Sequence, residues 1–369
     1  MKRYVHEKIR YIETYRPDDE HVLVIPGERT ELIPNGRSRI YSIRSPLVSR
    51  SSRYRALLNL TALGEILQRE RPDLIESSDP YQVGWKTATF GRLFRIPVVA
   101  FYHSHFPEAY LPGPTRLLQP LAEEYARALY NRYQATLVPS PDLVRILDQW
   151  GVRNLHQVNL GVNTEYCSPD PDDASATRQL LGVTPDRTLL LYVGRLAHEK
   201  NTETLFAAFG ILAQRNPGKF AMLIIGDGPQ RKILDQLRAA NPEVKWLQYC
   251  ADPMELARFY RCADLFVHPG IKETFGLVAL ESQACATPVV GIRGSRMDRV
   301  ICHDQESWAL ENRPDALANA IENFAQKDLG AVGKAAAKVV TERFAWPRVF
   351  DDLFRIYQEV IEKYGGLKS

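Results

Sequence analysis

The sequence predicts an α/β protein made of two doubly wound domains, each a parallel β-sheet with helices on both faces. A chain of 369 residues exceeds the usual size of a single hydrophobic core, so two domains are expected. Short apolar runs of strand length alternate with helical patterns, and this order indicates βαβ crossovers. The runs are apolar throughout, which is typical of strands in a sheet that is covered on both faces.

The second half of the chain shows this rhythm most clearly. Helical patterns, such as 201–214 and 229–240, separate five expected strands, at 188–194, 221–226, 245–250, 264–270 and 287–292. In doubly wound sheets ligands bind at the carboxyl ends of the strands. We therefore expect the functional residues in the loops that follow these strands.

The first half repeats the pattern, with expected strands at 21–27, 73–79, 96–104, 135–140 and 155–161. A helix at 2–15 precedes all of them, although such a domain usually begins with a strand. We therefore expect either that upstream sequence is missing or that the domain is trimmed, and we prefer missing upstream sequence. As given, the domain lacks its first strand and the glycine-rich loop after it. A Pro- and Asp-rich segment at 163–175 is the expected linker.

These patterns divide the chain into three parts. Residues 1–163 form the first domain, 164–345 form the second, and 346–369 form a final helix with a strongly periodic apolar face.

Composition restricts the compartment and the partners. Hydrophobic content of 45% and charged content of 25% are typical of a soluble globular protein, and a net charge of +3 gives no reason to expect nucleic acid. The five cysteines form no CxxC pair, which favours reduced thiols and the cytosol. No apolar run reaches the length of a membrane span and no signal peptide is recognisable. We expect a cytoplasmic protein, with any membrane contact peripheral and at the inner face.

The segment Ile271–Val290 carries two glutamates around a turn and a helix start. The amides at the mouth of this helix form an anion site, and Gly276 allows a phosphate to approach the backbone. Glu273 lies just outside that site, where it can accept hydrogen bonds from sugar hydroxyls. Glu281 lies roughly 10 Å further along, where it can hold a ribose. The alternative makes Glu281 a solvated helix residue and Glu273 an N-terminal charge.

Two other strand-end loops carry candidates. Arg195 follows the terminal Gly194 of one expected strand and Lys200 begins the next helical pattern, so the two cations suit a pyrophosphate. Gly226, after the next strand, allows close approach of a ligand. The alternatives are a solvated pair of charges and an ordinary turn.

Taken together, the segments GRLAHEKN, IIGDGPQ, CADLFVHPG and ETFGLVALESQACATPVV resemble the family 4 (group 1) retaining glycosyltransferases of the GT-B fold. The resemblance is specific over about 185–295 and looser before 170. It implies two Rossmann-like domains facing across a cleft, with the sugar nucleotide held mainly by the second and the acceptor by the first. It also implies that the C-terminal helix packs back on the first domain.

The resemblance assigns roles to residues at matching positions. Arg195 and Lys200 would neutralise the diphosphate leaving group, Glu273 would bind the donor sugar and Glu281 the ribose. The phosphate or sugar oxygens would be held by the amides of Phe275, Gly276 and Leu277. In VVAFYHSHFPEAY, at 98–110, His103 would contact the reacting centre, with His105 as the nearby alternative.

Two features depart from the family pattern. Ala286 stands where the family usually has glycine, and the extra methyl affects packing rather than chemistry. The glycine-rich loop that closes the site in relatives is absent, and MKRYVHEK resembles the helix that normally follows it. Activity depends on that loop.

A metal and a cofactor are not expected. Asp170-Pro171-Asp172 has the DxD spelling of another glycosyltransferase fold, but it lies in the linker, and no His/Cys spacing suggests zinc. The segment from Arg37 to Arg55 carries six arginines. It is interpreted either as a solvated loop or as a surface for an anionic acceptor or membrane.

The expected activity is transfer of a hexosyl group from a nucleoside diphosphate sugar to a hydroxyl of a glycan, lipid or small molecule, with retention. The stretches FYHSHFPEAY and RGSRMDRVI resemble those of enzymes that use GDP-mannose, so mannosyl is preferred. The alternatives are an epimerase or phosphorylase on the same fold, and a non-catalytic protein that keeps only the donor pocket.

Overall fold

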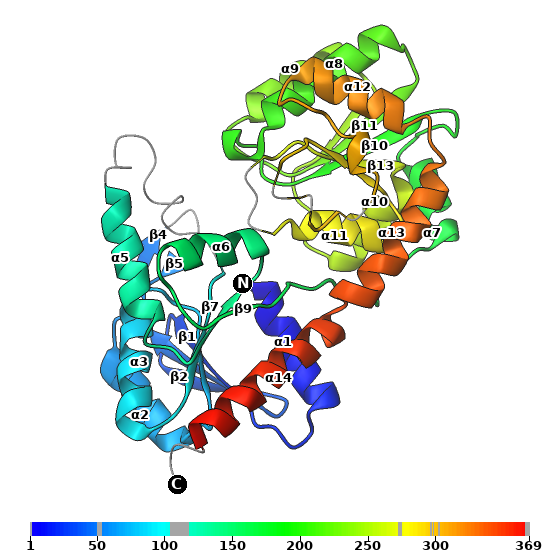
Figure 1. The fold of residues 1–369 in the computed structure, drawn as a ribbon. Coiled ribbons are helices and arrows are strands. Elements are labelled where there is room, and N and C mark those ends of the chain that lie inside the picture. The colour runs from blue at the N-terminus through cyan, green and yellow to red at the C-terminus, as the bar shows by residue number, and fades with distance from the viewer. Residues whose placement is uncertain are drawn as a thin grey trace. The chain divides into compact units, whose positions relative to one another are not determined.

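The computed structural model describes residues 2–49, 54–103, 118–271, 275–295, 297, 299–301 and 303–365 (Figure 1). The chain divides into two compact units. Unit 1 comprises Met1–Asn159 together with Val349–Ser369, and unit 2 comprises Leu160–Arg348. The domain limits proposed from the sequence, after residues 163 and 345, lie close to these boundaries.

Unit 2 is built on one sheet of five parallel strands in the order β12-β11-β10-β13-β14. The strands are β10 (Thr188–Val193), β11 (Phe220–Ile225), β12 (Val244–Leu247), β13 (Leu265–His268) and β14 (Val289–Gly291). Helices cover both faces (Figure 1): α7 (Pro171–Leu180), α8 (Thr202–Arg215), α9 (Arg231–Ala240), α10 (Pro253–Cys262), α11 (Leu277–Ala284), α12 (Pro314–Phe324) and α13 (Leu329–Phe344). The five predicted strands are confirmed.

The strand order of unit 2 reverses next to β10. This strand pairs with β11 on one side and with β13 on the other, so the chain runs outward in one direction and then returns to build the opposite side. A crevice forms outside the carboxyl ends of two strands at such a reversal. The loops after β10 and β13 therefore define the place where a ligand is expected.

Unit 1 contains a sheet of four parallel strands, β6-β7-β8-β9, and a separate three-stranded sheet, β1-β3-β2, in which β2 is antiparallel. A short β4–β5 pair stands apart. The strands are β1 (Val22–Gly27), β2 (Glu31–Asn35), β3 (Ser38–Arg44), β4 (Leu47–Ser49), β5 (Tyr54–Arg55), β6 (Ile75–Ser77), β7 (Val98–Phe101), β8 (Ala135–Val138) and β9 (Leu155–Gln157). The helices are α1 (Lys2–Tyr15), α2 (Leu60–Glu70), α3 (Gln82–Phe94), α5 (Gln119–Tyr130), α6 (Pro141–Gln149) and, at the end of the chain, α14 (Trp346–Gly365).

The arginine-rich segment is not simply a solvated loop, because most of its first part is strand β3. Ile43 is fully buried and Tyr41 nearly so. Arg37 donates to the carbonyl oxygens of Ile12 and Glu13 near the end of α1. Arg39 pairs with Glu20 and Glu70, and Arg55 pairs with Glu28. These described arginines therefore join parts of unit 1.

The final helix packs against the first, as expected for a C-terminal helix that returns to the first domain. The Tyr11 hydroxyl donates to Asp351 at 2.5 Å. The Lys8 ammonium lies 2.6 Å from the Glu76 carboxylate and 3.0 Å from the Tyr357 hydroxyl, which also bonds to Glu76. The Lys8 and Glu76 side chains are only 11% and 13% exposed, so this ion pair joins α1, β6 and α14 in a largely dry environment.

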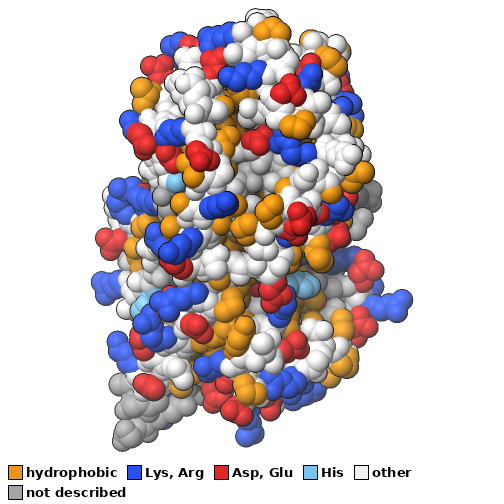
Figure 2. Space-filling view, turned by 90° about the vertical axis from the view of Figure 1, so that its right-hand side faces the viewer, with side chains coloured by type: hydrophobic (Ala, Val, Ile, Leu, Met, Phe, Trp, Pro, Cys, Tyr) orange, Lys and Arg blue, Asp and Glu red, His pale blue; other side chains and the backbone are white. Residues whose placement is uncertain are grey.

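Basic and acidic side chains are interspersed over the face drawn in Figure 2, in keeping with the small net charge. Among the helices formed by described residues, none combines the length and apolar character needed to cross a bilayer.

Replacing Lys8 by alanine should destabilise unit 1 by about 3 kcal/mol, because it leaves the Glu76 carboxylate buried without its counter-ion. The double variant Lys8→Met/Glu76→Gln should be markedly less destabilised. Urea unfolding measures the free energy of unfolding of both variants, and hydrogen exchange in α1 and α14 locates the loss of stability. The matched control is Arg355→Ala in α14. The Arg355 side chain is 67% exposed and pairs with Asp352, so its loss should change the free energy of unfolding by less than about 1 kcal/mol. Equal effects of Lys8→Ala and Arg355→Ala would contradict this assignment.

Candidate functional site

The loops after β10 and β11 are held together by backbone hydrogen bonds. The Gly194 amide donates to Ile225 O and the Leu196 amide to Asp227 O, each at 3.0 Å. The Gln230 amide then donates back to Leu196 O at 3.0 Å. The segment that carries Arg195 is therefore fixed at the carboxyl edge of the sheet by its neighbour.

Glycine is required in these loops because the two backbones touch. Gly226 has φ of 148°, and a Cβ placed on it would lie 1.8 Å from Gly194 O. A Cβ on Gly228 would lie 2.3 Å from Leu196 O. The approach of a ligand to Gly226 stays a prediction, and contact between the two loops is by itself sufficient reason for glycine there.

Both predicted cations lie in the connection that follows β10. Arg195 is 64% exposed and lies 3.4 Å from Glu199, a weak surface ion pair that another anion can replace. Lys200 is half-buried in the short helix η2 (His198–Lys200), where its amide donates to Ala197 O. The two residues thus occupy the edge of the sheet where the sequence placed them.

Helix α11 starts close to the predicted position. Gly276 is its N-cap, with φ of 81° and ψ of 50°, a left-handed conformation that favours glycine. Leu277 begins the helix, and the positive end of the helix dipole lies at its first turn, where the Ala279 amide donates to Gly276 O at 3.0 Å. Phe275 is 6% exposed and its ring meets Phe344 edge-on at 6.4 Å. The aromatic ring thus anchors the helix start in the core.

Glu281 is buried, so its interpretation as a solvated helix residue is wrong. It is 6% exposed, and the fully buried Tyr260 hydroxyl donates to its Oε2 at 3.1 Å. A buried carboxylate is costly unless hydrogen-bonded. This placement supports a polar role inside unit 2 rather than on its surface.

His103 follows β7 in unit 1. Its ring stacks on Phe101 at 4.2 Å and meets Tyr4 edge-on at 5.0 Å. Within the described part of the chain, its buried Nε2 has no hydrogen-bond partner. Burial, assisted by the charge of Lys8, lowers the pKa of His103 to about 3, so the imidazole is neutral near pH 7. Glu273 and His105, which the sequence also proposed, lie outside the described residues.

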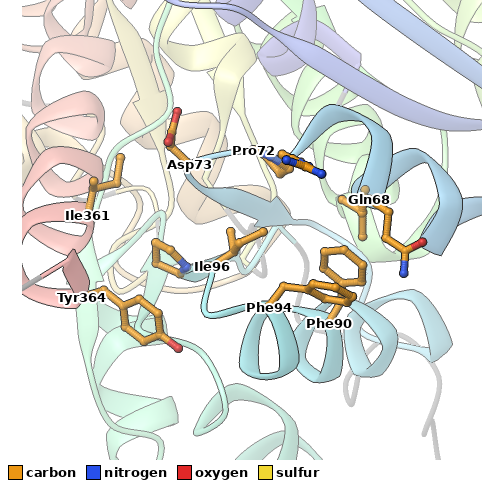
Figure 3. Close-up of a pocket in the computed structure, with 11 residues that line it drawn as sticks. Gln68, Pro72, Asp73, Phe90, Phe94, Ile96, Ile361 and Tyr364 are labelled. Carbon is orange, nitrogen blue, oxygen red and sulfur yellow. The ribbon is translucent and has the colours of Figure 1, made fainter. Parts of the chain in front are cut away.

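A cavity of about 590 Å³ lies elsewhere in unit 1. Its lining includes Phe90 and Phe94 of α3, Ile96, and Ile361 and Tyr364 of α14 (Figure 3). Ile96 precedes β7, so the cavity is at the amino ends of the strands. It lies at the opposite edge of the sheet from His103 and contains none of the predicted site residues.

Tyr260 and Asn201 contact the candidate site, but sequence reasoning did not single them out. Tyr260 lies in a periodic helix and is indistinguishable there from an ordinary core aromatic. Asn201 follows Lys200 with φ of 57°. An Asn between two helical segments was the available signal, because Asn adopts left-handed conformations more readily than most residues.

Possible metal ligands do not gather in the described part of the chain, where no three His, Cys, Asp or Glu side chains lie close enough to hold an ion. Asp170 of the DxD spelling instead caps α7, accepting from the Asp173 amide at 3.1 Å. Asp173 in turn pairs with Arg258 and Arg261.

Comparison with family models covers nearly the whole chain in two adjacent matches. Residues 1–166 match Glycosyltransferase Family 4 and residues 173–339 match Glycosyl transferases group 1. Solved structures share the fold. A sucrose-phosphate synthase from Thermosynechococcus elongatus aligns with a TM-score of 0.77 and 21% identity, over 96% of this chain and 92% of that one. Anabaena Alr3699/HepE in complex with UDP and glucose aligns with a TM-score of 0.71 and 17% identity, over 96% and 95%.

Curated relatives are similar over much of their length. A GDP-mannose-dependent alpha-(1-6)-phosphatidylinositol dimannoside mannosyltransferase from Mycobacterium tuberculosis is 30% identical over 89% of this chain and 85% of its own. The sulfoquinovosyl transferase SQD2 of Arabidopsis thaliana is 29% identical over 76% of this chain, which spans only 55% of that relative. The chain belongs to the group 1 (family 4) glycosyltransferases, and its fold is GT-B.

Substituting Gly226 by alanine should destabilise unit 2 by at least about 2 kcal/mol, because the new methyl meets a backbone oxygen that cannot rotate away. Thermal unfolding measures the effect. Gly210→Ala in α8 is the matched control, since a Cβ there meets nothing within 4 Å. It should be neutral or stabilise by about 0.5–1 kcal/mol. A neutral Gly226→Ala would show that the two loops are not in contact.

His103 should stay neutral to well below pH 5. Because its pKa is about 3 in the folded protein and near 6.5 when unfolded, protons bind preferentially to the unfolded chain. Its contribution to stability is complete above about pH 6.5 and is lost as the pH falls toward 3, by about 2 kcal/mol at pH 5. NMR of the imidazole tests this, and His103→Asn should flatten the acid limb of stability. His6→Asn, at an exposed histidine of α1, should not. Titration of His103 near pH 6.5 would overturn the assignment.

Proposed function

We propose that this glycosyltransferase moves a hexosyl group from a nucleoside diphosphate sugar to an acceptor hydroxyl with retention of the anomeric configuration. One observation carries the proposal: Lys200 and the start of α11 follow neighbouring strands at the reversal point of the unit 2 sheet. A cation and a helix N-terminus at one sheet edge suit a diphosphate.

Different residues bind different parts of the donor. Arg195 and Lys200 neutralise the charge that grows on the departing diphosphate, and the amides of Phe275, Gly276 and Leu277 bind its oxygens. Glu281 accepts from the ribose hydroxyls, and Glu273 binds the donor sugar. His103, in unit 1, acts in this proposal as a neutral hydrogen-bonding imidazole rather than as a cation.

The reaction follows a front-side course. The bond from the anomeric carbon to the diphosphate oxygen breaks, the acceptor oxygen bonds to that carbon from the same face, and the acceptor proton passes to the departing phosphate. No metal or cofactor takes part in this scheme, because the cations and the helix dipole supply the positive charge.

Mannosyl from GDP-mannose is the preferred donor group. Besides the motif resemblance, a relative at 30% identity is named as a GDP-mannose-dependent mannosyltransferase. The acceptor is a glycan, a lipid or a small molecule, and the enzyme works in the cytoplasm or at the inner membrane face. The segment Arg37–Arg55 was proposed to contact an anionic acceptor or membrane. Among described residues this surface is reduced to the exposed Arg44, Leu47 and Val48, because Arg37, Arg39 and Arg55 bind other residues of unit 1.

Two other functions predict different results. A non-catalytic binding protein would bind the donor without turnover, and an epimerase would alter the free nucleotide sugar without an acceptor. Upstream genomic sequence also discriminates, because an in-frame strand and Gly-Gly loop before Met1 favours transfer.

Thermal shifts against GDP-mannose, UDP-glucose and ADP-glucose test the donor. A ligand at 100 times its Kd should stabilise the protein by about 2.7 kcal/mol.

Lys200→Ala and Glu273→Gln should each lower transfer at least about 100-fold without unfolding the protein. Lys334→Ala, at an exposed lysine of α13, is the control and should leave transfer unchanged. NMR of the product should show the anomeric configuration of the donor. Inversion, no response to any donor, or wild-type rates in both variants would refute the proposal.

A further inference from the structure

One side chain joins three segments around the candidate site. Asn201 Nδ2 donates to Pro269 O at 2.8 Å and to Asn312 Oδ1 at 2.6 Å. Its Oδ1 accepts from the Thr204 hydroxyl at 2.8 Å. Both amide hydrogens and one oxygen lone pair are thus in use, which is most of what an Asn side chain offers.

The backbone of Asn201 explains how the side chain reaches these partners. It has φ of 57° and ψ of 33°, which ends η2 and begins α8. Its amide donates to His198 O at 2.9 Å. The left-handed conformation turns the chain sharply between the two helices, and Asn tolerates it better than most residues.

The bond to Pro269 spans the reversal point of the sheet. Lys200 is the preceding residue and belongs to the connection after β10, whereas Pro269 directly follows β13 and leads toward α11. β10 and β13 pair at only two residue pairs, Leu190↔Leu265 and Leu191↔Phe266, so the strands themselves do not fix their carboxyl ends to each other. The Asn201 amide makes that connection beyond the paired region.

We infer that Asn201 is a positioning residue that sets the spacing between Lys200 and the approach to α11, and thereby the affinity for the diphosphate of the donor. This inference rests on the proposed function, since it assumes that a diphosphate binds there. Asn201 itself touches no reacting atom in this assignment. It acts through the two connections that it holds together.

The test compares variants that keep the backbone but lose different bonds. Asn201→Gly retains the left-handed conformation and removes all three side-chain bonds. Asn201→Asp retains the oxygen that accepts from Thr204 but removes both donors and sets a carboxylate against two oxygens. Thr204→Val removes only the bond on the α8 side, and Asn312→Ala leaves the bond to Pro269 in place.

The donor used in this test is the nucleotide sugar that gives the largest thermal shift with the wild-type protein. Asn201→Gly and Asn201→Asp should raise its Kd, measured by calorimetry, on the order of tenfold. Thr204→Val and Asn312→Ala should leave it within about twofold. Transfer assays should show the Asn201 loss mainly in donor KM rather than in kcat, which a general loss of stability would not produce.

A readout without ligand separates this inference from the proposed function. Hydrogen exchange at Gly270, Phe275, Gly276 and Leu277 should quicken in both Asn201 variants and not in Thr204→Val. If no nucleotide sugar binds the wild type, the proposed function fails, whatever the exchange data show. If the wild type binds a donor but the Asn201 variants bind it equally well, or exchange at these amides is unchanged, only the positioning role is overturned.

Discussion

The parallel pairing of β10 with both β11 and β13 is the constraint on which unit 2 depends. It makes the strand order reverse beside β10, and it brings the connection after β10 next to the connection after β13. The first connection carries Arg195 and Lys200, and the second leads to α11. Hydrogen bonds beyond the strands then fix both: backbone bonds tie the β10 loop to the β11 loop, and Asn201 ties it to Pro269. The candidate site is a product of sheet topology refined by a few loop contacts.

The parts that sequence could predict are those governed by local pattern. Strands β10 to β14 are apolar runs with clear limits, and the positions of Arg195, Lys200 and Gly276 follow from where those strands end. Strands β2 and β3 were not predicted, because their Arg, Ser and Pro residues hide the pattern, and because β3 is stabilised by partners distant in sequence. Arg39, for example, finds its carboxylate at Glu70. Side-chain partnerships such as Tyr260 with Glu281 depend on packing between helices, which no periodicity encodes.

Burial changes the meaning of two residues that the sequence treated as polar. The sequence allowed Glu281 to be either a ribose ligand or a solvated helix residue, and the carboxylate lies inside unit 2, where it accepts from the Tyr260 hydroxyl. His103 lies at a strand end, where its charge cannot be deduced from sequence, and burial lowers its pKa to about 3. Neither effect is visible in the residue type. A neutral His103 can accept or donate a hydrogen bond near pH 7 and carries no positive charge.

The packing of α14 on α1 has a consequence for how the protein is made. Unit 2 is one continuous stretch of chain, whereas unit 1 combines residues before and after it. Lys8 and Tyr11 of α1 bind Tyr357 and Asp351 of α14, which are made much later. On the ribosome the first part of unit 1 therefore emerges first but acquires α14 only after all of unit 2 has been made. Domains usually fold in order from the N-terminus. Here the order of completion is reversed, because unit 2 can fold before α14 has been made. The Lys8–Glu76 ion pair gains its contact with Tyr357 only after that helix has emerged.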